Sequence, residues 1–81
     1  MVTRYKTAAF QFDYTKFRND LVAFRDAHGF KHCEIDELAG IGYGNTSNII
    51  GKKTTNHTMN VWLSLANAMD IDVRTYFVLA D

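Results

Sequence analysis

Proline is absent from this 81-residue sequence, cysteine occurs once, and neither sign of charge is in excess. With Cys33 alone, the chain can form neither an internal disulfide nor a zinc site of four cysteines. No apolar run approaches the roughly 18 residues that a membrane-spanning helix needs, and the N-terminus has no signal-peptide core. We therefore expect one small cytoplasmic domain with no cofactor, no bound metal and no membrane contact.

The charge balance argues mildly against a nucleic-acid partner, because nine basic and nine acidic residues cancel. The charges are unevenly distributed, however. Residues 1–12 and 41–60 carry +2 each, and residues 30–40 and 61–81 carry −2 each. A weakly basic face is therefore expected around the middle of the chain.

In the absence of proline, glycines mark the ends of elements, and the apolar spacing between them is helical. The first helix is predicted from Tyr14 to His28, with Asp13 as its N-cap and Gly29 as the left-handed residue that ends it. Phe12 and Phe17 are placed to pack as a hydrophobic staple. The segment 10–12 alternates like a strand but is too short to decide anything.

Four more short helices are predicted after the first. The second runs from His32 to Ala39, the third from Tyr43 to about Gly51, the fourth follows a Thr58 cap, and the fifth follows an Asp72 cap. Their expected buried residues are Ile35, Leu38 and Ala39, then Thr46, Ile49 and Ile50, then Met59, Trp62, Leu63, Ala66 and Met69, and finally Val73, Tyr76 and Phe77. The sequence thus predicts a compact all-α domain at 13–81, preceded by a partly flexible arm at 1–12.

Two short helices around a glycine-containing turn are typical of a helix-turn-helix. Residues 34–53, EIDELAGIGYGNTSNIIGKK, resemble the helix-turn-helix of lambda-repressor and Cro-like phage regulators. Residues 58–77 are similar to the fourth and fifth helices of that family, above all in LANAM at 65–69. The resemblance covers about residues 13–77. It implies a five-helix DNA-binding domain, working in a bacterial or phage-infected cell.

The chain departs from the family pattern at two positions. The usual alanine of the second helix falls on Asp36, and the buried valine or isoleucine of the third falls on Thr46. Shifting the register to put Ala39 on the alanine position would replace the turn glycine by Tyr43. We keep the register with Gly40 in the turn, because the turn needs a residue that tolerates positive φ.

The resemblance implies a sequence-specific transcriptional repressor whose third helix reads the major groove of an operator. The base-reading candidates are Tyr43, Gly44, Asn45, Ser47 and Asn48, and asparagine can pair with adenine through two hydrogen bonds. The phosphate-contacting candidates are His32, Lys52, Lys53, Thr54 and Thr55, with Arg4 and Lys6 as possible arm contacts. On composition alone, Asn45, Ser47 and Asn48 are more typical of a solvated helix face, and Lys52 and Lys53 of solvated charges; the surrounding pattern is what favours DNA contacts.

A homodimer on an inverted-repeat operator is expected, paired through Val73, Tyr76, Val78 and Leu79, unless this apolar segment folds back into the core. The alternative function is a protein-interaction module, antirepressor- or antitoxin-like, which the departures at Asp36 and Thr46 favour. No enzyme and no small-molecule substrate are expected. GKKT at 51–54 lacks the P-loop spacing, and Cys33 beside His32 is a sequence neighbour rather than a catalytic pair.

Overall fold

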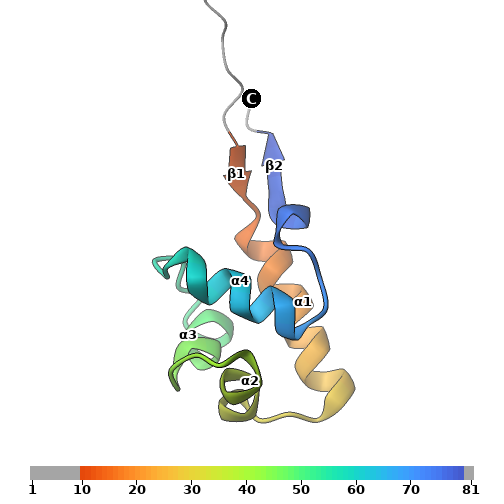
Figure 1. The fold of residues 1–81 in the computed structure, drawn as a ribbon, viewed down its shortest axis with the longest axis vertical. Coiled ribbons are helices and arrows are strands. Elements are labelled where there is room, and N and C mark those ends of the chain that lie inside the picture. The colour runs from red at the N-terminus through yellow and green to blue at the C-terminus, as the bar shows by residue number, and fades with distance from the viewer. Residues whose placement is uncertain (1–9, 80–81) are drawn as a thin grey trace, which may run out of the picture.

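The computed structural model of the chain describes residues 10–79 (Figure 1). In this range the elements are β1 (Phe10–Phe12), α1 (Tyr14–His28), α2 (His32–Ala39), α3 (Asn45–Gly51), α4 (Met59–Ala68), a 3₁₀ turn (Val73–Tyr76) and β2 (Phe77–Leu79). The helices gather at one end, and the two strands project side by side from it (Figure 1). The described residues thus form a compact, mostly helical unit with a small sheet added.

The ends of α1 confirm the predictions made from local sequence. The Asp13 carboxylate accepts a hydrogen bond from the Lys16 backbone N at 3.0 Å, which satisfies one free amide of the first turn. Gly29 ends the helix with φ 67°. The Phe12 and Phe17 ring centroids lie 5.7 Å apart, as the staple requires.

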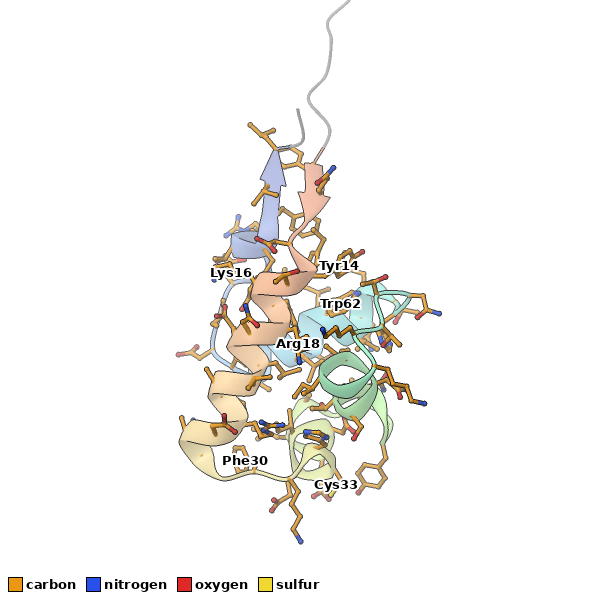
Figure 2. All side chains as sticks on the ribbon, turned by 180° about the vertical axis from the view of Figure 1, so that it is seen from behind. Tyr14, Lys16, Arg18, Phe30, Cys33 and Trp62 are labelled. Atoms are coloured by element: carbon orange, nitrogen blue, oxygen red, sulfur yellow. The ribbon has the colours of Figure 1, made fainter. Side chains whose placement is uncertain are left out.

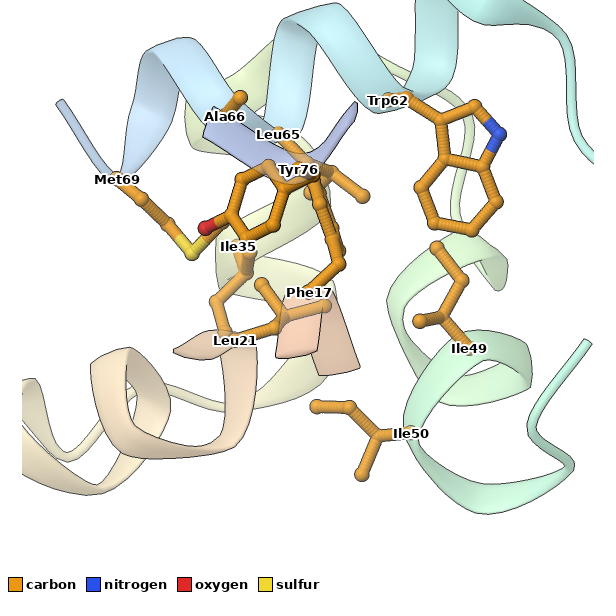
Figure 3. Packing of buried hydrophobic residues seen from close by; sticks show 10 residues of the cluster. All are labelled: Phe17, Leu21, Ile35, Ile49, Ile50, Trp62, Leu65, Ala66, Met69 and Tyr76. Carbon is orange, nitrogen blue, oxygen red and sulfur yellow. The ribbon is translucent and has the colours of Figure 1, made fainter. Parts of the chain in front are cut away.

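The core lies between α1, α2, α3 and α4 (Figure 3). Its fully buried members include Phe17, Leu21, Ile35, Leu65 and Tyr76. Leu65 was not among the expected core residues, although it faces inward beside Trp62 and Ala66.

Three residues expected in the core are exposed: Leu38, Met59 and Leu63. The direction in which each helix faces explains two of them. The buried side of α2 is centred between Ile35 and Asp36. Successive side chains are about 100° apart around a helix, so Leu38 points about 110° away from that centre. In α4 the buried side runs through Trp62, Leu65 and Ala66 instead of Leu63. The prediction was wrong because it assumed that every apolar residue near the stripe belongs to it.

The predicted fifth helix is also wrong. Asp72 does act as a cap, accepting from the Arg74 backbone N at 3.0 Å, but it begins only a 3₁₀ turn. The chain then extends as β2, which pairs antiparallel with β1, Phe10 opposite Leu79 and Phe12 opposite Phe77. A short helix would have one buried face for this apolar segment, whereas strand pairing satisfies its backbone and lets Phe77 pack on Phe12. Residues 10–12, assigned to the arm, therefore belong to the fold.

Candidate nucleic-acid interface

The connection between α2 and α3 starts at a left-handed glycine. Gly40 has φ 72°, and its backbone N donates to the carbonyl oxygens of Asp36 and Glu37. The Ile41 backbone N also donates to the Asp36 carbonyl oxygen, at 3.0 Å. These bonds close α2 in the manner of a Schellman turn, and the positive φ is the property for which the register was chosen.

A buried carboxylate joins α2 to the start of α3. Asp36 is 0% exposed, and it accepts from the backbone N of Gly44 and of Thr46, each at 2.9 Å. The Thr46 hydroxyl donates to the same carboxylate at 2.7 Å. Gly44 occupies the N-cap position without a side chain, so Asp36 supplies the capping oxygen from the neighbouring helix. The two departures from the family pattern thus form one interaction.

The third helix begins at Asn45, two residues later than predicted, because Gly44 has φ 102° and is not helical. It packs inward through Thr46, Ile49 and Ile50, as expected. Its other side carries the base-reading candidates. Tyr43 is 72% exposed, Ser47 is exposed, and Gly44, Asn45 and Asn48 are half-buried.

The two asparagines of α3 differ in their freedom to bind a ligand. The Asn45 side-chain amide donates to the Gly42 carbonyl oxygen at 2.8 Å and so holds the turn. The Asn48 side chain has no hydrogen-bond partner within residues 10–79, so its donor and acceptor both remain free there. Asn48 is therefore better suited than Asn45 to pair with a base edge.

The side chain of His32, the first residue of α2, contacts both α1 and α3. Its Nε2 is 3.1 Å from Arg25 Nη1, and its Nδ1 is 2.9 Å from Ser47 Oγ. A guanidinium can only donate, so Nε2 accepts, and the neutral ring carries its proton on Nδ1 and donates to Ser47. Arg25, which the sequence did not single out, thus joins two candidate residues in one polar network.

The loop after α3 carries the remaining candidates. Lys52, Lys53 and Thr55 are exposed, whereas the half-buried Thr54 hydroxyl lies 2.6 Å from His57 Nε2. The segment 41–60 contains no acidic residue, and neither lysine forms a salt bridge with any residue that the structure describes. The two positive charges are therefore open to an external anion.

Arg18 is a further cation at this surface that sequence reasoning missed. Its Nε donates to the Ile50 carbonyl oxygen at 3.0 Å, across 32 residues of sequence, and so caps the end of α3. No local pattern marks such a contact, because it depends on how α1 crosses α3. Arg4 and Lys6, the possible arm contacts, lie outside the described residues.

The predicted dimer residues fall in different environments. Val78 and Leu79 are exposed on β2, and Val73 is half-buried. Tyr76 is wrong as an interface residue, because it is 0% exposed and its hydroxyl donates to the Asp20 carboxylate at 2.8 Å. Burial, together with this hydrogen bond, raises the pKa of Tyr76 above its ordinary value. The hydrogen bond from Lys16 lowers the pKa of Asp20, and the bond from Tyr76 adds to this.

Among the described residues, no group of three or more His, Cys, Asp or Glu is placed to hold a metal ion. No helix in the same range has the length and apolar character needed to cross a bilayer.

Comparisons with known proteins gave no match: no family model fits the chain, and no curated protein or solved structure is significantly similar.

Proposed function

We propose that the chain is a sequence-specific DNA-binding transcriptional regulator of the repressor type. In this proposal α2 and α3 are a helix-turn-helix, and α3 enters the major groove of an operator. The observation that carries the proposal is the division of α3 into two sides. One side is buried through Thr46, Ile49 and Ile50. The other presents polar side chains beside Lys52 and Lys53, which form no salt bridge with the residues at 10–79.

The polar side chains then take different roles. Asn48 and Ser47 reach base edges, and Tyr43 contacts the neighbouring DNA backbone or a base. Gly44, without a side chain, lets the protein main chain come close to the DNA. Lys52, Lys53 and Thr55 contact phosphates, which positions the domain without specifying sequence. The ring nitrogens of His32 are already bonded to Arg25 and Ser47, so His32 orients Ser47 instead of contacting a phosphate. Arg25 holds the His32 ring toward Ser47, while its own charge is paired with Asp26.

Dimerisation through the sheet is part of the proposal. Phe10 is 66% exposed and Leu79 is 61% exposed, and they lie opposite each other on the sheet face that also carries Phe12 and Phe77. A second copy that covers this apolar face would also pair with a free strand edge. Two recognition helices about 34–36 Å apart would then bind an inverted repeat far more tightly than one.

The test is a mobility-shift titration with DNA from upstream of the gene, using Asn48→Ala and the matched control Asn67→Ala. Both asparagines lie on helix surfaces, but Asn67 is on α4, away from α3. Asn48→Ala should weaken specific binding by about 1–3 kcal/mol, the size of a lost bidentate base contact, and should leave binding to random DNA unchanged. Equal binding by parent and Asn48→Ala would contradict the proposed reading helix.

The alternative function is a protein-interaction module that does not read DNA. One observation favours it: Leu38 is 56% exposed beside a shallow hollow lined by Ala39, Ser64, Asn67 and Ala68. An exposed apolar side chain beside a hollow of mixed polarity would suit a partner protein. Retention on heparin together with a specific mobility shift supports the regulator, whereas failure of both supports the interaction module.

A further inference from the structure

A groove of about 200 Å³ lies between the N-terminal half of α1, the loop after α3 and the start of α4. Ile49 and Trp62 form its apolar floor, and Tyr14 stands at its side. Tyr14, Arg18 and Trp62 lie close to one another where α1 faces α4 (Figure 2). The groove is thus a mixed site, with an aromatic wall on one side and a polar loop on the other.

The polar side of the groove contains donors and positive charge but no carboxylate. Arg18 is held in place through the bond from its Nε to the Ile50 carbonyl oxygen, and its terminal nitrogens have no other partner within residues 10–79. Lys53 lies opposite, also without a salt bridge in that range. The hydroxyls of Thr15 and Thr55 add further donors. Such a set matches an anion with several acceptor oxygens.

The end of α3 fixes the position of Lys53. Its φ is 55°, a left-handed conformation that residues other than glycine, asparagine and aspartate rarely adopt. The loop is held there by bonds from the backbone N of Lys52 and of Thr54 to the Asn48 carbonyl oxygen. Lys53 follows the C-cap of α3, a position where helices commonly end in this conformation, so the helix end determines where the Lys53 side chain leaves the loop.

We propose that this groove binds a small phosphate ester. The phosphate, with three acceptor oxygens and a charge of about −1.5 to −2 at neutral pH, contacts Arg18 and Lys53. The organic part packs against Tyr14 and Trp62. The volume is below the roughly 300–1,000 Å³ typical of drug-sized ligands, which restricts a small ligand to a phosphate with one ring or short sugar.

Binding in the groove does not depend on the proposed DNA-binding function, and it is tested without DNA. If both hold, the ligand and the operator compete for Lys53, so that the phosphate ester releases the protein from DNA. The two proposals therefore fail separately.

The single tryptophan provides the measurement, because Trp62 lines the groove. Phenyl phosphate and ribose 5-phosphate are titrated against the intact chain at constant ionic strength, and Trp62 fluorescence is followed. We expect a saturable change with a dissociation constant of about 1 mM or tighter for at least one ester. Ribose should give no change, and inorganic phosphate should bind at least about fivefold more weakly because it leaves the aromatic wall empty.

Two matched variants localise the effect. Lys53→Asn removes the charge and keeps a residue that tolerates positive φ, and Lys52→Asn removes the neighbouring charge, which does not line the groove. We expect Lys53→Asn to weaken the ester by about tenfold, as the loss of a charged hydrogen bond implies, and Lys52→Asn to change it by less than about twofold. Circular dichroism checks that both variants keep the fold.

Several results would overturn the proposal. One is that neither ester gives a saturable change in Trp62 fluorescence below about 10 mM. Another is that inorganic phosphate binds as tightly as the esters. A third is that the two lysine variants lose equal affinity for the ester. A Lys53-dependent change given by random duplex DNA, with no response to the esters, would assign the groove to the DNA backbone instead.

Discussion

Replacing the buried Asp36 by alanine is expected to destabilise the junction of α2 and α3 strongly. The change removes the acceptor for the backbone N of Gly44, the backbone N of Thr46 and the Thr46 hydroxyl. Thr46 is itself 0% exposed, so water cannot readily replace the lost oxygen. Each orphaned buried donor costs about 1–3 kcal/mol, partly offset because the variant no longer buries a carboxylate. We expect the free energy of unfolding to fall by about 3 kcal/mol.

The double variant Asp36→Ala/Thr46→Val separates this interaction from general damage. Thr46→Val alone should cost about 1 kcal/mol, because it removes one hydrogen bond and leaves the carboxylate with two backbone donors. Once Asp36 is absent, the hydroxyl is itself an orphan, so its removal should cost almost nothing. The double variant should therefore lie within about 0.5 kcal/mol of Asp36→Ala, a coupling of about 1 kcal/mol.

Urea denaturation followed by Trp62 fluorescence and by circular dichroism measures these differences, and each 1 kcal/mol should also lower Tm by about 4–8 °C. Glu37→Ala is the matched control, an exposed acid on the same helix, and should change stability by less than about 0.5 kcal/mol. If Asp36→Ala does not fold, Asp36→Asn keeps one acceptor oxygen and should show a smaller loss. A neutral Asp36→Ala, or additive losses in the double variant, would refute the capping role.

Three further predictions follow from the charged loop, the C-terminal turn and the sheet. Replacing Lys52 and Lys53 together by alanine should weaken specific and random DNA binding alike and reduce the slope of log affinity against log salt by about two, one per lost phosphate contact; an unchanged slope would place both lysines in solvent. Hydrogen bonds from Arg74 lower the pKa of Asp72 from its usual 3.8 to about 2. The ionised carboxylate therefore stabilises the turn above about pH 4, and this stabilisation is lost as the pH falls toward 2. In Arg74→Ala, a carboxyl NMR titration should find the pKa of Asp72 raised from about 2 but still below 3.8, because the backbone N of residue 74 still donates to the carboxylate, and a pKa still near 2 would contradict the pairing. Leu79→Asp, on the proposed interface face, should keep the chain monomeric in sedimentation at concentrations where the parent dimerises, and a parent that is monomeric at every concentration would remove the proposed sheet interface.

Local features of the sequence determined much of the helical part of the fold. The bounds of α1 and α2 followed from apolar spacing, from Asp13 and from the glycines that end each helix. The buried side of α3 followed in the same way from Thr46, Ile49 and Ile50. These features are readable because each depends on residues within about four positions, where helix geometry leaves few alternatives.

The tertiary structure alone decided the contacts between distant segments. The partners of Asp36, Arg18 and Tyr76 lie ten, 32 and 56 residues away in sequence, at Thr46, Ile50 and Asp20. The pairing of β2 with β1 is more distant still, and it turned an expected fifth helix into a strand. A carboxylate, a guanidinium or a free strand edge has many possible partners, and which of them it meets depends on how the helices cross. That crossing is set by the packing of the whole core, which no local pattern contains.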